Sequence, residues 1–167
     1  MLFESEIPTE EIFKRMRQDI YDNYNINIYS NLNKEYITSR SNIFSIIHKI
    51  CEKLGFHSQT FFLSVQYLDI ILSKKNSNIP FSKYNIVGLA CLCLSSKFCE
   101  NDPAVPHHSN FAIVYNNILS SGCKNILTKN DLLFYEVLAV KLLNYKLNYN
   151  TIYDFDSFFW AHGIVKI

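Results

Sequence analysis

Residues 85–101 read NIVGLACLCLSSKFCEN, and this stretch decides the fold. Between Ile86 and Phe98 the only charged residue is Lys97, and the others are nearly all apolar or small. A helix that is apolar on almost every side belongs inside a protein, so the stretch predicts a buried central helix over 86–98. Small residues along it would let neighbouring helices approach closely: Gly88, Ala90, Ser95 and Ser96.

The segments on both sides carry apolar residues at three- and four-residue spacing, which is typical of amphipathic helices. Gly55 supplies a C-terminal stop for the upstream helix, and Ser58 is a candidate cap for the next one. Ser82 is the candidate cap of the central helix, and Thr128 with Asp131 resembles a capping box. The predicted helices cover 9–24, 43–54, 58–72, 86–98, 111–119, 131–144 and a last segment that begins at Asn150 or Thr151.

Three segments interrupt this helical pattern. Residues 25–37 are rich in asparagine and irregular, and 74–80 and 100–110 are predicted loops. No stretch alternates strictly between apolar and polar residues between hairpin turns, so the fold class is all-α. At 167 residues one core suffices, and we divide the chain into an N-terminal helix with linker (1–38) and a single domain (39–167).

Composition restricts the class of function. Apolar residues make up 49% of the chain and the net charge is +1, which argues against a protein that mainly neutralises phosphates, so nucleic acid is not expected as a partner. The longest apolar run, near 86–94, is about half of what a bilayer requires, and no membrane partner is expected. An odd number of cysteines and the absence of a signal-peptide layout favour a reducing compartment, the nucleus or the cytoplasm.

Four charges stand in otherwise apolar helical stretches: Arg40, Asp69, Lys97 and Glu136. A charge among apolar neighbours costs several kcal/mol unless it is paired. Each therefore needs a partner, either within the fold or on another molecule.

Several motifs in register resemble the cyclin box. They are Arg40, then TFFLSVQYLD (60–69), VGLACLCLSSKF (87–98) and YEVLAVKLLNYKL (135–147), and the likeness covers about Arg40 to Phe159. The resemblance implies a five-helix bundle around its third helix, preceded by an extra N-terminal helix, so that 39–167 is a single cyclin-box domain. It also implies a regulatory subunit that binds and activates a cyclin-dependent serine/threonine protein kinase, needs no cofactor and has no small-molecule substrate.

The same resemblance implies a role for each charge. In the family, the positions of Arg40 and Asp69 form a structural ion pair between the first two helices. The positions of Lys97 and Glu136 contact main-chain groups around the kinase αC helix, which favours the active state of the kinase. Apolar positions flank this pair in the family, and they correspond here to Phe98, Val140, Tyr145 and Leu147.

The chain departs from the family pattern at three places. Many cell-cycle cyclins carry a substrate-docking patch that includes a Met, a second apolar residue and a Trp. In this chain the corresponding positions hold Ser39, Asn42 and Ile46, so we do not expect this patch to recruit substrates. The segment 100–127 is longer than in typical cell-cycle cyclins, which favours a transcription-associated cyclin as an alternative. The resemblance covers one box, whereas many cyclins have two. We therefore expect either a cyclin with a single box or a cyclin from which a second box was removed.

Other classes of function remain as alternatives. A cyclin-fold adaptor like the general transcription factors would need a basic stripe, and none is visible. Cys91 and Cys93 with His107 and His108 could be metal ligands, but two cysteines two apart on a helix face different ways, so no metal site is predicted. His48 and His57 lack the setting of a catalytic base, so no enzyme is predicted.

Overall fold

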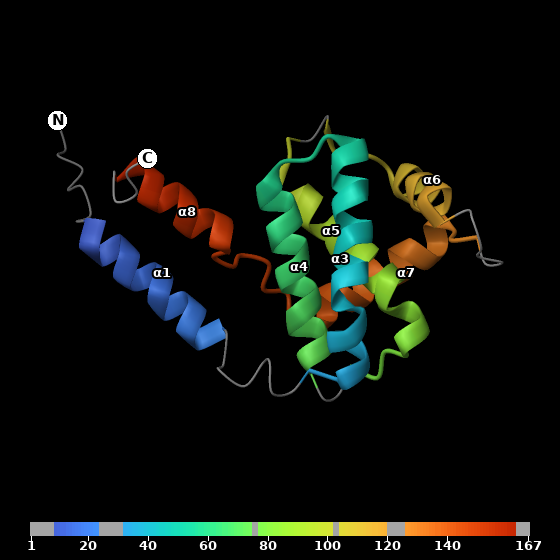
Figure 1. Ribbon diagram of the computed structural model, residues 1–167, viewed down its shortest axis with the longest axis horizontal. Helices are drawn as coiled ribbons and strands as arrows, with labels where there is room; N and C mark the ends of the chain where they lie inside the picture. Colours follow the sequence, from blue (N-terminus) through green and yellow to red (C-terminus); the bar gives the residue numbers. More distant parts are fainter. Residues whose placement is uncertain (1–8, 24–31, 75–76, 102–103, 120–125, 163–167) are drawn as a thin grey trace.

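The computed structural model describes residues 9–23, 32–74, 77–101, 104–119 and 126–162. Within these ranges it has seven α-helices, one 3₁₀ turn and no strand, which confirms the all-α prediction (Figure 1). The elements are α1 (Thr9–Asn23), α3 (Lys34–Leu54), α4 (Ser58–Ser73), η1 (Phe81–Lys83), α5 (Tyr84–Cys99), α6 (His108–Leu119), α7 (Lys129–Leu142) and α8 (Ile152–Ala161). Among the described residues, none of the helices combines the length and the hydropathy that a bilayer-spanning segment needs.

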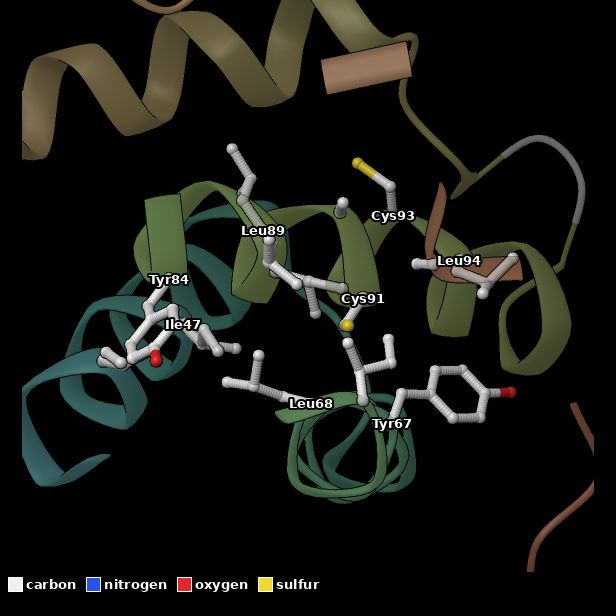
Figure 2. Packing of buried hydrophobic residues seen from close by; sticks show 14 of the residues in the cluster. Ile47, Tyr67, Leu68, Tyr84, Leu89, Cys91, Cys93 and Leu94 are labelled. Carbon is white, nitrogen blue, oxygen red and sulfur yellow. The ribbon is translucent and has the colours of Figure 1, made fainter. Parts of the chain in front are cut away.

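Helix α5 is the centre of the bundle, as its sequence predicts. It is buried from Val87 to Ser96 and packs against α3, α4 and α7. A Cβ on Gly88 would lie 3.0 Å from Cδ1 of Ile47, so the absence of a side chain there lets α3 approach α5 closely. Figure 2 shows Ile47, Leu68 and Leu89 among the side chains of this core.

The thiols of the core are free and buried. Cys91 and Cys93 lie on α5, and Cys51 lies on α3. Burial, followed by the charge of Glu100, raises the pKa of the Cys51 thiol to about 12, so this thiol stays protonated at neutral pH. No group of three His, Cys, Asp or Glu side chains in the described ranges could hold a metal ion; Cys123 lies outside those ranges.

Helix α3 begins earlier than the sequence suggested. It starts at Lys34, because the side chain of Asn33 accepts a hydrogen bond from the backbone N–H of Glu35 and so caps the helix. The irregular assignment of 25–37 is therefore wrong for 34–37, while 25–31 lie outside the described residues. The division between 38 and 39 falls inside α3 and stays a prediction. Gly55, at φ 71°, ends α3 as predicted.

Some of the predicted helix caps are present in the structure and others are not. A capping box opens α7 at Thr128, as predicted, and α8 begins after Thr151, one of the two predicted starts, which forms a second capping box with Asp154. Ser58 and Ser82 are not caps: Ser58 is the first residue of α4, and Ser82 lies in η1, ahead of the start of α5. At the start of α4 a carboxylate from elsewhere in the fold replaces the missing cap, as described below.

Helices α1 and α8 lie side by side at one edge of the molecule, and α8 also contacts α4 of the bundle, where Gln59 Nε2 donates to Asp154 Oδ1 at 3.1 Å (Figure 1). The Phe13 ring of α1 stacks on Phe158 at 5.8 Å and touches Phe155 and Phe159 of α8. The aromatic segment 154–160 therefore packs on α1 and not within the main core. A hydrogen bond of 2.9 Å from Asn150 Nδ2 to Asp19 Oδ2 further joins α1 to the chain ahead of α8.

Candidate functional site

Arg40 and Asp69 form a two-pronged ion pair between α3 and α4. Arg40 donates from Nε to Oδ1 of Asp69 at 3.0 Å and from its terminal nitrogen to Oδ2 at 2.7 Å. The Tyr36 hydroxyl donates to the same Oδ1 at 2.6 Å, and the Arg40 guanidinium lies over the Phe44 ring. The carboxylate thus receives three hydrogen bonds, which is the condition under which a buried charge is tolerated.

Tyr36 is the member of this cluster that the sequence did not point to. It is fully buried, and burial, followed by the charge of Asp69, raises the pKa of its hydroxyl well above the usual range. The hydroxyl is therefore a permanent donor to Asp69. Together with Arg40, it makes the cluster a structural junction of the first two helices of the bundle.

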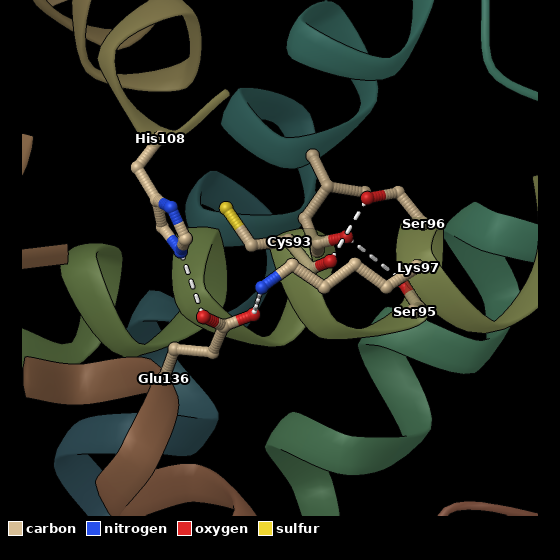
Figure 3. Close-up of polar contacts among 7 residues, drawn as sticks. Cys93, Ser95, Ser96, Lys97, His108 and Glu136 are labelled. Carbon is tan, nitrogen blue, oxygen red and sulfur yellow. Dashed lines mark hydrogen bonds and ion pairs between the residues drawn. The ribbon is translucent and has the colours of Figure 1, made fainter. Parts of the chain in front are cut away.

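Lys97 and Glu136 meet where α5 packs on α7 (Figure 3). Nζ of Lys97 lies 2.6 Å from Oε1 of Glu136. The Glu136 side chain is only 7% exposed, whereas the Lys97 side chain is 45% exposed. The four charges singled out in the sequence thus form two pairs within the chain, and in the second pair the ammonium group keeps a face in solvent.

His108 is the third member of the Lys97–Glu136 cluster. Its Nε2 atom lies 2.7 Å from Oε2 of Glu136, the oxygen that Lys97 leaves free (Figure 3). From its place in the sequence, His108 was expected at most to be a metal ligand. Helix periodicity could not have found this contact, because His108 and Glu136 are 28 residues apart and lie on different helices.

The four apolar residues at the positions that flank this pair in the family are exposed or half-buried. Phe98 is 51% exposed and Tyr145 is 72% exposed, while Val140 and Leu147 are half-buried. Three further apolar residues of α7 are exposed, and sequence reasoning did not select them: Leu133, Phe134 and Val137. Leu133 and Val137 are spaced i, i+4 and flank Glu136, so they extend the apolar surface along α7.

The end of α7 holds Tyr145 in an unusual backbone conformation. Asn144 and Tyr145 have φ values of 54° and 60°, in the left-handed region that bulky residues avoid. The N–H of Tyr145 bonds to the carbonyl of Val140, and that of Asn144 bonds to the carbonyl of Lys141, a pattern that closes a helix C-terminus. The closed turn projects the Tyr145 side chain into solvent.

Buried groups fix the chain that follows α7. The Tyr67 hydroxyl donates to the carbonyl of Leu147 at 2.5 Å, and the Lys74 ammonium donates to the carbonyl of Leu142. Tyr67 is fully buried, so its position is set by the core. The segment 142–147 is therefore anchored at both ends from α4 and its C-terminal cap residue.

Glu100 joins the end of α5 to the start of α4. Its side chain accepts from the His57 backbone N–H at 2.8 Å and from the Thr60 hydroxyl at 2.5 Å, and its other oxygen lies 2.7 Å from Nδ1 of His57. Burial raises the pKa of this carboxyl, but the hydrogen bonds from Thr60 and His57 outweigh it and leave the pKa lowered. Glu100 is thus the cap of α4 that Ser58 does not provide.

The positions of the substrate-docking patch offer little apolar surface. Ile46 is buried in the core, Asn42 is exposed and polar, and the Ser39 hydroxyl bonds to the carbonyl of Glu35 in its own helix. Ile43 of the same segment is also buried.

Comparisons with known proteins found a matching family model and similar relatives. The family model of the cyclin N-terminal domain matches residues 10–148, from α1 to the segment after α7, so α8 lies outside the match. G1/S-specific cyclin-E of Caenorhabditis elegans is 31% identical over 99 residues, which cover 59% of this chain and 17% of the relative. G1/S-specific cyclin-E1 of Danio rerio is 28% identical over 100 residues, which cover 60% of this chain and 22% of the relative. The match thus spans less than a quarter of either relative.

Proposed function

Because the chain belongs to the cyclin family, we propose that it binds and activates a cyclin-dependent serine/threonine protein kinase. One observation carries the proposal: the ion pair Lys97–Glu136 keeps its ammonium group half-exposed, and two exposed rings lie on the same elements, Phe98 directly after Lys97 and Tyr145 just after the end of α7. Exposed aromatic side chains are typical of specific protein interfaces, and charged groups beside them fix the register of the partner. We call the six residues Lys97, Phe98, Glu136, Val140, Tyr145 and Leu147 the kinase-binding surface.

The proposed mechanism is conformational. An active kinase pairs the glutamate of its αC helix with the lysine of its β3 strand. The half-exposed ammonium of Lys97 can donate to main-chain carbonyls of that region, and Glu136 can accept further hydrogen bonds because each carboxylate oxygen has two lone pairs. A surface that binds only the inward position of αC shifts the kinase to its active state.

Members of the cyclin family are regulatory, and we extend this to the chain itself: it supplies binding energy and carries out no chemistry. The names of the two relatives favour a role at the G1/S transition, and we place the protein in the nucleus, the cytoplasm or both. The long segment 100–127 supports a second candidate, a transcription-associated cyclin or a cyclin-fold adaptor of the transcription machinery. The identity of the bound kinase separates these two roles.

Affinity capture tests the proposal directly. The full chain and its Lys97→Ala/Glu136→Ala variant are immobilised, exposed to lysate of the source cells, and the bound proteins are identified by mass spectrometry. The matched control is Glu52→Ala/Lys53→Ala, which removes one charge of each sign from exposed positions of α3. We expect the wild type and the control to retain a cyclin-dependent kinase and the variant to lose it.

Activation requires a second measurement. The captured kinase, produced in recombinant form, is assayed on a peptide substrate with and without the purified chain. An increase in kcat that the Lys97→Ala/Glu136→Ala variant does not produce supports the proposal. Capture of transcription factors or DNA without any kinase would leave the fold intact and overturn the function.

A further inference from the structure

The carboxylate of Glu136 is held from two sides by two different helices. Lys97 of α5 contacts Oε1 at 2.6 Å, and His108 of α6 contacts Oε2 at 2.7 Å (Figure 3). An ionised carboxylate only accepts hydrogen bonds, so Nε2 of His108 carries the proton in this contact. The two contacts together fix both the position of the carboxylate and the orientation of its plane.

The core determines where His108 stands. It is the first residue of α6, and the backbone N–H groups of Asn110 and Phe111 bond to the carbonyl of His107, which closes the first turn. Phe111 is fully buried, with its ring 5.8 Å from that of Phe56. The His108 ring therefore sits on a helix whose first turn is anchored in the core, and its side chain is 26% exposed.

The other ionisable neighbour of the cluster does not compete for this role. Cys93 of α5 lies beside it (Figure 3), and burial, followed by the charge of Glu136, raises the pKa of its thiol well above the usual range. The thiol is therefore neutral, so the charges at the cluster are those of Lys97, Glu136 and, when protonated, His108.

We propose that His108 is a positioning residue for Glu136 within the kinase-binding surface, an inference that rests on the function proposed above. A glutamate side chain has three rotatable bonds, and ordering such a side chain at an interface reduces affinity. Because His108 and Lys97 hold the carboxylate before the kinase arrives, that ordering is completed on folding. The segment 100–127, which is longer than in typical cell-cycle cyclins, thereby acquires a role: it carries α6, and with it His108.

Three variants test this role by kinase affinity. His108→Leu removes the donor, His108→Gln keeps a donor on a flexible side chain, and His107→Leu changes the exposed neighbouring histidine as a matched control. Affinity is measured for a purified recombinant cyclin-dependent kinase, the one that the wild-type chain captures. We expect His108→Leu to weaken binding about five- to tenfold, His108→Gln to restore most of it, and His107→Leu to leave it unchanged.

The background of Glu136→Ala separates positioning from a general loss of structure. If His108 acts through Glu136, His108→Leu has no further effect on affinity once Glu136 is removed. An equal loss in both backgrounds would overturn the proposal, as would an unchanged or increased affinity of the single variant His108→Leu.

A measurement without kinase keeps this inference separate from the proposed function. In protein labelled with ¹³C-glutamate, we expect the Glu136 carboxyl resonance to shift in His108→Leu and to stay unchanged in His107→Leu. An unshifted resonance overturns the inference alone. A shifted resonance in a chain that binds no kinase would show that His108 holds Glu136 for another purpose, which overturns both proposals.

Discussion

Nζ of Lys97 lies 2.6 Å from Oε1 of Glu136, so the one charge of the apolar stretch 86–98 neutralises a buried charge of α7. A lysine at a helix C-terminus and a glutamate in mid-helix each have an ordinary surface explanation when considered alone. Their contact gives them a structural role between α5 and α7 as well as the proposed role in kinase binding. Variants of this pair must therefore be assessed for stability and affinity together.

The first prediction concerns the free energy of unfolding of the pair. Lys97→Ala or Glu136→Ala alone should destabilise the protein by about 1–2 kcal/mol, since each leaves a charged group without that partner. The double variant should cost less than the sum by about 1 kcal/mol. Urea unfolding of the three variants and the wild type measures this coupling. Strictly additive effects would mean that the two side chains do not interact in solution.

The second prediction concerns the junction of α3 and α4. Asp69→Ala should destabilise the protein by about 3 kcal/mol, because it leaves the Tyr36 hydroxyl buried without its acceptor and Arg40 without the carboxylate. Tyr36→Phe removes one of the three hydrogen bonds and should cost about 1–2 kcal/mol. Kinase affinity, compared at a temperature where all variants are folded, should not change. If Asp69→Ala or Tyr36→Phe is as stable as the wild type, the cluster does not have the structural role assigned to it.

The sequence predicted the pattern of the fold because it depends on local spacing. The apolar stretch 86–98 and the capping box at Thr128 lie within short windows, and the structure agrees with them. Isolated charges in apolar helices were also visible, which is how Arg40 and Asp69 were selected. Their assignment as a pair came from the family resemblance, because spacing alone does not relate residues on different helices.

What the sequence missed are contacts between distant segments. Glu100 caps α4 across 43 residues of sequence from His57, and His108 reaches Glu136 across 28. In both cases the hydrogen bond forms only after the helices have packed, so no local sequence pattern indicates the contact. The serines at 58 and 82 have suitable side chains for capping, but tertiary contacts determine where α4 and α5 begin.

The third prediction is a pH dependence of stability that originates in Glu100. Its pKa is lowered in the folded protein from a usual value of 4.5, so its contribution is complete above that pH and is lost as the pH falls through the folded pKa. At neutral pH, Glu100→Gln should be less stable than the wild type by about 1–2 kcal/mol. The difference should shrink once the pH falls below 4.5.

Urea unfolding of wild type and Glu100→Gln at a series of pH values from neutral to acidic measures this difference. Glu52→Gln, an exposed position on α3, is the control and should show no such trend. If the difference in the free energy of unfolding between wild type and Glu100→Gln stays constant over the series, the charge of Glu100 does not stabilise the start of α4.

The last prediction separates backbone strain from binding at Tyr145. Its φ of 60° costs a bulky residue about 1 kcal/mol that glycine does not incur, while glycine loses a similar amount in chain entropy. Tyr145→Gly should therefore be about as stable as the wild type, and Tyr145→Ala, which keeps the strained conformation, should be no more stable than Tyr145→Gly. Both lack the exposed ring and should bind the kinase roughly tenfold or more weakly, as expected for an aromatic anchor. Urea unfolding and kinase titration of the two variants measure both effects. If Tyr145→Gly binds as well as the wild type, the ring is not part of the kinase-binding surface.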